Sequence, residues 1–286
     1  MALSADTSDQ LTNDQIAAIL TEPLQARSVF LAAGPVIIDT DGSPVRIPGI
    51  DSVYDDLAWY GENEQIDDVT PGDLETELLP STMKSVKVIT RYSNELARQS
   101  VIQLDTVLQD RLVADVAAKI DAQLLGDTGD GVTTPRGLFA YEGTQSVDVS
   151  GDLTLDAVLE AQGLAMAANV NTGTMRLVLN PAHYMALREA KDADERYMLE
   201  PDATAGAVGA VLGVPVVVSP YVPDGSAALV DFAQIAVARD LAPSVTVLTE
   251  RYADYDQQAI RVVARYDAKP MNPEAVVTLD GIGAGS

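Results

Sequence analysis

The feature that most constrains the fold is a long stripe of apolar residues between Val101 and Leu124. Apolar side chains recur at steps of three or four residues, at Val101, Leu104, Leu108, Leu112, Val116, Ile120 and Leu124. This spacing places them on one face of an α-helix. Ser93 or Asn94 can cap the helix, which then has about 30 residues and spans about 45 Å at ~1.5 Å per residue. Such a helix far exceeds the usual ~11 to 12 residues and predicts a structural backbone for the whole subunit.

The segment upstream of this helix has a different composition. Two short β-rich runs, residues 36–38 and 45–47, flank a turn signal at residues 39–44. Between Tyr54 and Glu77 the chain carries nine acidic residues and few apolar ones. Because a segment so poor in apolar residues cannot form a core of its own, residues 36–80 are predicted to form an extended arm.

Other elements flank the arm and the long helix. A short amphipathic helix is predicted at residues 11–20, with Thr12 or Asn13 as its cap. Residues 84–92 alternate apolar and charged side chains, which predicts a strand with one face in water. Residues 126–131 (GDTGDG) predict a loop that ends the long helix.

Helices and strands alternate in the second half of the chain. A helix is predicted at residues 155–168, and Asn180 followed by Pro181 predicts the start of another. Strands are predicted at residues 175–179, 214–218, 227–232, 235–238, 245–251, 259–266 and 275–279. The sum predicts an α+β fold with an arm, a long helix and a mixed second half.

Composition excludes several classes of function. The 286 residues are 47% hydrophobic and 21% charged, which is typical of a folded globular protein. No run of about 18 apolar residues occurs, and the start lacks an export-signal pattern, so we expect neither a membrane span nor export by a signal peptide. The net charge is −25, and such a field repels nucleic-acid phosphates. The absence of cysteine excludes disulfides, thiol nucleophiles and cysteine-ligated metals.

No motif in the sequence predicts a catalytic, cofactor-binding or metal-binding residue. The sole histidine, His183, has neither a cysteine nor a second histidine to work with, so we interpret it as a packing or surface residue. The loop at residues 126–131 departs from the calcium-loop spacing, and Glu142 is out of phase for a bidentate ligand. Asp254 and Asp256 are one pair among 43 acidic residues. We therefore expect no enzyme, cofactor or metal.

Several short motifs follow one another in a fixed order along residues 25–280. Residues 57–62 read LAWYGE, residues 87–96 read KVITRYSNEL, and residues 125–138 run from LGDTG to PRGL. Further signposts are Asn180-Pro181, Leu187-Arg188, Lys191-Asp192, residues 196–199 (RYML) and residues 212–219 (LGVPVVVS). In this order the motifs resemble those of tailed-bacteriophage major capsid proteins of the Hong Kong 97-like fold family, namely its W-x-x-E, its S-x-E-L and its glycine-rich stretch ending in P-x-G.

The resemblance implies an α+β Hong Kong 97-like capsid fold. Mapped onto this sequence, it implies an N-arm at residues 1–35, an extended E-loop hairpin at 36–82, a P-domain with a long spine helix at 83–152, an A-domain at 153–242, and C-terminal strands shared by both domains at 243–286. It implies a major capsid (head) protein that self-assembles as hexamers and pentamers into an icosahedral shell. This shell would enclose the double-stranded DNA genome of a virion assembled in the host cytoplasm.

Two departures from the family pattern change the expected partners and chemistry. About 35 residues precede the E-loop, fewer than a cleaved scaffolding segment has, so we expect a separate scaffolding protein beside a portal protein and optionally a decoration protein. Some relatives join their subunits by an isopeptide bond from an E-loop lysine. Here Arg46 is the sole basic residue between Val36 and Thr82, so that bond is not expected.

Two alternatives stay open at this point. An encapsulin-like bacterial nanocompartment shell protein would have a shorter excursion than the 45 residues from Val36 to Pro80, which favour a phage shell. An acidic hydrolase would need two carboxylates that converge in one cleft. No spacing in the sequence selects such a pair.

Overall fold

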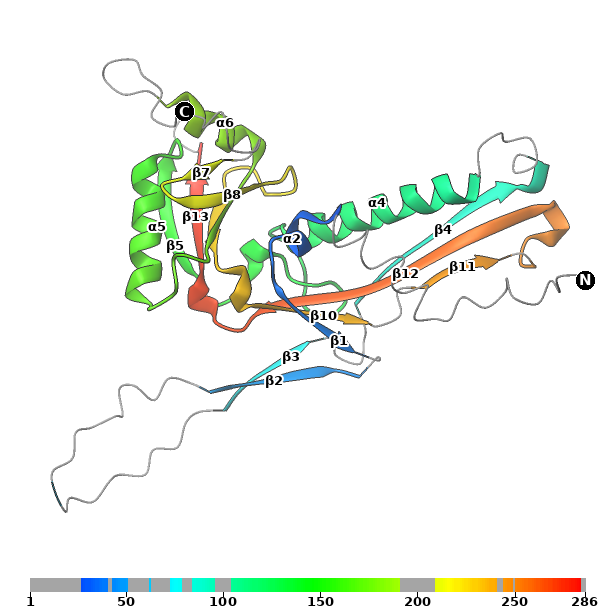
Figure 1. The fold of residues 1–286 in the computed structure, drawn as a ribbon, viewed down its shortest axis with the longest axis horizontal. Helices are drawn as coiled ribbons and strands as arrows, with labels where there is room; N and C mark the ends of the chain where they lie inside the picture. The colour runs from blue at the N-terminus through cyan, green and yellow to red at the C-terminus, as the bar shows by residue number, and fades with distance from the viewer. Residues whose placement is uncertain are drawn as a thin grey trace, which may run out of the picture.

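The computed structural model describes residues 27–40, 43–50, 62, 73–78, 84–95, 104–190, 209–240, 244–248 and 250–283. These residues form two β-sheets, a two-stranded hairpin and three helices of nine or more residues (Figure 1). The predicted α+β class is confirmed. No helix in the described ranges combines the length and apolar character that a membrane crossing requires.

The first sheet carries the long helix. It has five strands, in the order β1 (Val36–Thr40), β10 (Ile235–Asp240), β12 (Gln257–Pro270) and β11 (Ser244–Leu248), with β4 (Ser85–Ser93) paired to the other side of β12. β1 runs parallel to β10, and the remaining pairs are antiparallel. The helix α4 (Leu104–Leu124) lies along β4 and β12 (Figure 1).

The apolar stripe of α4 faces this sheet, as its spacing predicts. Leu112, Val116, Ile120 and Leu124 are all buried in the main core. The side chains of residues 101–110 and the start of the predicted helix at residues 96–103 lie outside the described residues. β4 shows the predicted alternation, with Lys87, Ile89 and Arg91 exposed and the residues between them more covered.

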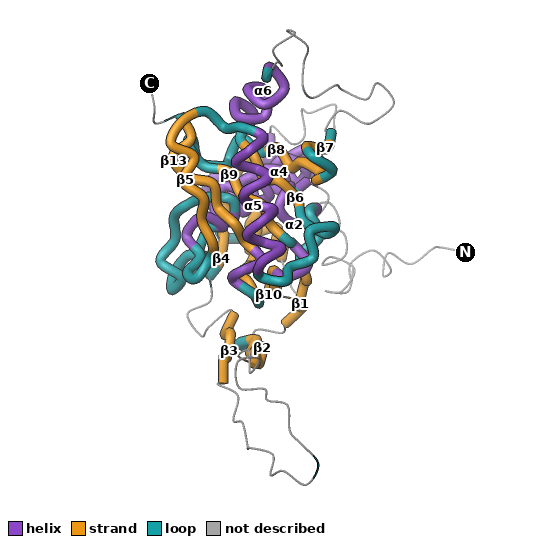
Figure 2. The backbone as a smooth tube through the Cα atoms, turned by 90° about the vertical axis from the view of Figure 1, so that its left-hand side faces the viewer, coloured by secondary structure: helices purple, strands orange, loops and turns teal. Residues whose placement is uncertain are grey.

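The second sheet has six strands and its own core. Its order is β5 (Gln145–Gly151), β13 (Val276–Ile282), β9 (Ala227–Val230), β6 (Arg176–Leu179), β8 (Val214–Val218) and β7 (Ala210–Val211). The helix α5 (Leu155–Ala167) packs against it through the fully buried residues Val158, Ala161 and Ala165. Figure 2 shows α5 in front of this sheet.

The predicted helix start at Asn180 is confirmed. The helix α6 (Pro181–Glu189) has Pro181 in its first turn, and the Asn180 side chain accepts a hydrogen bond from the Ala182 N–H at 3.0 Å. The first N–H groups of a helix have no partner within the helix. The Asn180 side chain accepts a hydrogen bond from one of them, and Pro181 has no N–H that would need a partner.

The prediction that residues 36–80 form an extended arm is wrong for the first strand of that segment, β1. β1 pairs with β10 inside the five-stranded sheet, and an ion pair of 2.6 Å joins Asp39 to Arg239 across this pairing. Ile37 packs against the main core and Ile38 against a small cluster around Leu78. Because adjacent strand residues point to opposite faces, both faces of β1 are partly covered, which the sequence pattern of an isolated arm did not predict.

The hairpin proper consists of β2 (Val45–Ile50) and β3 (Asp73–Leu78), which pair antiparallel. At its base Leu78 is only 1% exposed and packs with Ala236 and Ala238 of β10. The hairpin projects away from both sheets (Figures 1 and 2). The predicted helix at residues 11–20 and most of the acidic run between Tyr54 and Asp73 lie outside the described residues.

Candidate functional site

A cavity of about 410 Å³ opens between α4, β4 and the loop at residues 133–135. We call it the α4–β4 groove. Its apolar lining includes Val86 and Val88 from the strand and Val116, Ile120 and Leu124 from the helix. Three lysines, Lys84, Lys87 and Lys119, also border it. The groove therefore combines an apolar floor with cationic side chains.

Lys84 is held at the end of this groove by a buried ion pair. Its Nζ lies 2.7 Å from an oxygen of Asp267 on β12, and the two side chains are 6% and 2% exposed. The Ala268 N–H donates a further hydrogen bond of 3.1 Å to Asp267. Buried charges require such partners because each loses its hydration. The pair ties the start of β4 to β12.

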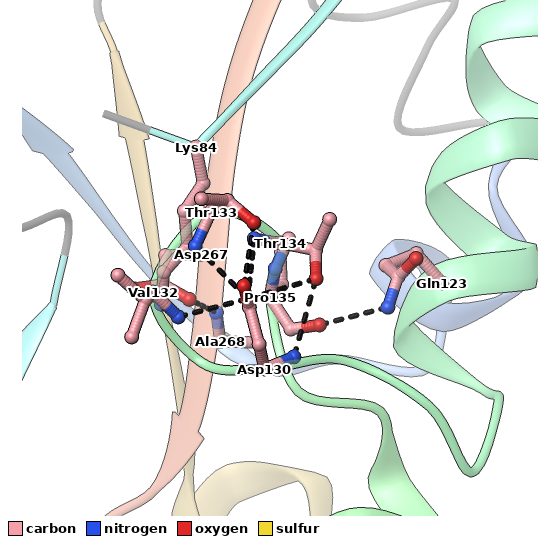
Figure 3. Close-up of polar contacts among 9 residues, drawn as sticks. All are labelled: Lys84, Gln123, Asp130, Val132, Thr133, Thr134, Pro135, Asp267 and Ala268. Carbon is pink, nitrogen blue, oxygen red and sulfur yellow. Dashed lines mark hydrogen bonds and ion pairs between the residues drawn. The ribbon is translucent and has the colours of Figure 1, made fainter. Parts of the chain in front are cut away.

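The loop after α4 is organised by Asp130 (Figure 3). Its carboxylate accepts hydrogen bonds from the N–H groups of Val132, Thr133 and Thr134 at 3.0, 2.9 and 2.8 Å. The hydroxyls of Thr133 and Thr134 donate to it at 2.6 and 3.0 Å. These hydrogen bonds, led by the Thr133 hydroxyl, hold the pKa of the Asp130 carboxyl well below its usual range.

Further contacts hold this loop at the end of α4, where the sequence predicted that the helix ends. Gln123 of α4 donates hydrogen bonds from Nε2 to the carbonyls of Thr128 and Pro135, which holds the loop against the helix. Gly137 must lack a side chain because a Cβ there would lie 2.0 Å from the Gly126 carbonyl oxygen. Glu142 pairs with Arg136 instead of contacting Asp130. The carboxylate of Asp130 is thus occupied by protein donors.

Asp121 anchors the first described segment to the opposite flank of α4. The segment contains the short helix α2 (Val29–Ala32), and Asp121 accepts hydrogen bonds from the Ser28 hydroxyl and the N–H groups of Val29 and Phe30 at 2.6, 2.8 and 3.2 Å. Burial raises the pKa of Asp121, and these three hydrogen bonds partly offset that effect. The carboxylate therefore holds the segment of Ser28 to Phe30 against α4.

The candidate residues weighed in the sequence occupy structural positions. His183 accepts a hydrogen bond at Nε2 from the Gly225 N–H at 3.2 Å, which ties α6 to the loop before β9. Asp256 accepts a hydrogen bond from the Asn94 side chain at 2.6 Å and has a left-handed backbone with φ of 50°. Among the described residues, no group of three or more His, Asp or Glu side chains is placed to hold a metal ion.

Comparison with known proteins decides the family. The model of the phage capsid family matches residues 10–281. The chain belongs to the phage capsid family. It is a major capsid protein that forms the shell of the virion, and its copies associate with one another in that shell. No curated protein sequence matches it.

Solved structures of phage capsid proteins and related particles share the fold. The capsid of a native GTA particle matches with a TM-score of 0.71 and 18% identity, over 89% of this chain and 90% of that one. A protein of Microbacterium phage Oxtober96 matches with a TM-score of 0.70 and 14% identity, over 88% and 90% of the two chains. A protein of Mycobacterium phage Adephagia matches with a TM-score of 0.66 and 17% identity, over 88% and 89%. The predicted Hong Kong 97-like capsid fold is confirmed.

Proposed function

We propose that this phage capsid protein assembles as hexamers and pentamers into an icosahedral shell around double-stranded DNA, without enzymatic activity of its own. The family match over residues 10–281 carries the proposal. The net charge of −25 supports it physically, because a container that repels phosphate does not bind its contents tightly.

We propose the family's division of the chain, with the E-loop shortened by what the fold shows. The N-arm then covers residues 1–35, the P-domain 83–152 with α4 as its spine, the A-domain 153–242, and residues 243–286 are shared between the two domains. The E-loop runs from β2 to residue 82, because β1 is part of the five-stranded sheet. A separate scaffolding protein, a portal protein and optionally a decoration protein are the further proposed partners.

Non-covalent contacts would hold such a shell together. The chain has no cysteine, and residues 36–82 have no lysine to form an isopeptide bond. Lys84, the nearest lysine to the hairpin, is engaged in its buried ion pair with Asp267. Extended segments that overlap a neighbouring copy supply interface area that a compact domain lacks.

Electron microscopy of the purified protein tests the proposal directly. We expect closed shells of uniform size that contain fivefold and sixfold clusters of subunits. A stable small oligomer that forms no shell under any assembly condition, alone or with its scaffolding protein, would contradict it.

The same shells test the absence of cross-links. On a denaturing gel after heating we expect one band near 30 kDa, the mass of the single chain at 30.2 kDa. A ladder of larger bands that survives boiling in detergent would show covalent joints, and it would point to Lys87 as the nearest exposed amine.

A further inference from the structure

The α4–β4 groove has one polar end and a mostly apolar lining beyond it. Lys84 and Tyr266 lie at the polar end, where the start of β4 meets β12. From there the lining follows β4 to Val88, and α4 contributes Val116 and Ile120 from the facing side. The volume of about 410 Å³ is typical of a small-molecule site. Such a groove suits an amphiphilic ligand with a polar head and an apolar tail.

The Tyr266 hydroxyl lines the groove and has no partner for a hydrogen bond. The residue is 4% exposed, and no group in the described part of the chain forms a hydrogen bond with its oxygen. Its cross-strand neighbour Arg239 directs the guanidinium to Asp39 instead, with Nε 2.6 Å from Oδ1. Buried polar side chains nearly always have a partner, so this hydroxyl points to a ligand that accepts a hydrogen bond from it.

The polar end offers donors and positive charge to such a ligand. Burial raises the pKa of Tyr266 to about 12, so the hydroxyl keeps its proton and can donate it. The Lys84 ammonium has three N–H groups, of which one is directed at Asp267 over 2.7 Å. Lys119, on the α4 side of the groove, is exposed and joins no ion pair within the described ranges. Donors beside a free cation favour an anionic head, as a carboxylate provides.

The apolar part of the groove sets the size of the tail. Val88 lies four residues along β4 from Lys84, about 13 Å at ~3.3 Å per residue, which is the length of about ten extended carbons. Asp115, the acidic residue in the lining, pairs with Arg111 at 3.1 Å and not with Lys119. The tail therefore meets valine and isoleucine side chains over most of its length.

We infer that the α4–β4 groove binds a linear aliphatic carboxylate of about ten carbons, the chemical class of the medium-chain fatty acids. Its carboxylate accepts hydrogen bonds from Tyr266 and Lys84 and has Lys119 as its counter-ion. Its tail covers Val88 and Val116. The site lies within one copy, so the inference does not depend on assembly into a shell. Because the ligand contacts α4 and β4 together only in the folded protein, it stabilises the folded subunit.

Isothermal titration calorimetry of the unassembled full-length protein with decanoate tests this inference. The ligand is kept below the concentration at which it forms micelles. We expect saturable binding at one site per chain, with an affinity that rises about fourfold for each CH₂ group added from octanoate to decanoate. Decylamine, which has the same tail length and a cationic head, should bind about tenfold more weakly. No binding of decanoate, or equal binding of decylamine, would overturn the inference.

Tyr266→Phe supplies the second test, because it removes the unpartnered hydroxyl and keeps the ring. Decanoate affinity should fall about tenfold, as expected for one hydrogen bond to a charged group. The midpoint of thermal unfolding without ligand should not fall below that of the wild type, since the hydroxyl has no partner to lose. Unchanged decanoate affinity in this variant would overturn the inference.

An exposed lysine and an exposed tyrosine complete the design. Lys119→Gln should fold normally and lower decanoate affinity about threefold, the size expected of an exposed ion pair, while binding uncharged 1-decanol like the wild type. Tyr255→Phe is the matched control, because Tyr255 is 72% exposed and lies outside the groove. It should bind decanoate like the wild type. A loss in Tyr255→Phe as large as that in Tyr266→Phe would place the ligand elsewhere and overturn the inference.

Discussion

The α4–β12 core, in which α4 packs on β4 and β12, differs from the β2–β3 hairpin in how much apolar surface one chain buries. The core contains fully or nearly fully buried residues from most of the chain, including Phe30 and Phe232, whose rings meet edge to face at 5.5 Å. At the base of the hairpin one large side chain, Leu78, is buried against two alanines of β10. The hairpin is a separate two-stranded sheet, and the two regions differ in their source of stability.

This difference teaches what each region contributes to a shell subunit. Burying a Leu side chain contributes about 1.5 to 3 kcal/mol, and an isolated two-stranded hairpin is at best marginally stable in water. The core therefore folds within one copy. We expect the hairpin to be ordered mainly by neighbouring copies.

The largest effect is expected from Val116→Asp, which places an unpaired charge in the α4–β12 core. Val116 lies on the buried face of α4 and is 3% exposed, so the substitution should cost well over ~3 kcal/mol of a total stability of ~5 to 15 kcal/mol. We expect no soluble folded subunit by circular dichroism. Asp115→Ala, at the exposed neighbouring position, should change stability by about 0.5 kcal/mol or less. If the Val116→Asp protein folds, the face of α4 that carries Val116 does not pack in the core.

A smaller but still large effect is expected from Lys84→Met. It removes the Lys84 ammonium from the buried ion pair with Asp267, and breaking such a pair typically costs about 3 to 5 kcal/mol. Urea unfolding of the subunit measures this cost. The double variant Lys84→Met with Asp267→Leu should recover most of it, because no uncompensated charge remains. A single variant as stable as the wild type would show that the pair does not hold β4 on β12.

Asp121→Asn should have an intermediate effect and a distinctive pH dependence. It weakens the hydrogen bonds from Ser28, Val29 and Phe30, at about 1 to 2 kcal/mol. Burial raises the pKa of Asp121 in the folded protein above 3.8, its value in the unfolded chain. Between these two pKa values the folded wild type binds more protons than the unfolded chain. The free energy of unfolding of the wild type should therefore fall, relative to that of Asp121→Asn, as the pH rises from 3.8 through the folded pKa. A pH-independent difference between the two in urea unfolding would contradict this.

Local periodicity was enough to predict the elements that a core requires. The stripe at Leu112, Val116, Ile120 and Leu124 predicted α4, and Asn180 with Pro181 predicted α6, because capping and burial act within a few residues. β3 was missed. Its sequence, DLETEL, is acidic and becomes a strand through its pairing with β2, a partner that its own pattern does not reveal.

The candidate site depended on contacts that no local pattern shows. Lys84 and Asp267 are 183 positions apart, and each is an ordinary charged residue in its own segment. The wall of the α4–β4 groove requires Gln123 to hold the loop at Thr128 and Pro135. The GDTGDG loop was correctly interpreted as the end of the helix, but its role in shaping a groove follows only from the packing.

Hydrogen exchange by mass spectrometry, on unassembled subunits and on shells, tests the central comparison most directly. Peptides from α4, β12 and β1 should be protected in both samples, because these elements are paired or packed within one chain. Peptides from residues 48–76 should exchange quickly in unassembled subunits and become protected in shells. Strong protection of residues 48–76 in demonstrably monomeric protein would contradict the account, since the hairpin would then be stabilised by its own subunit.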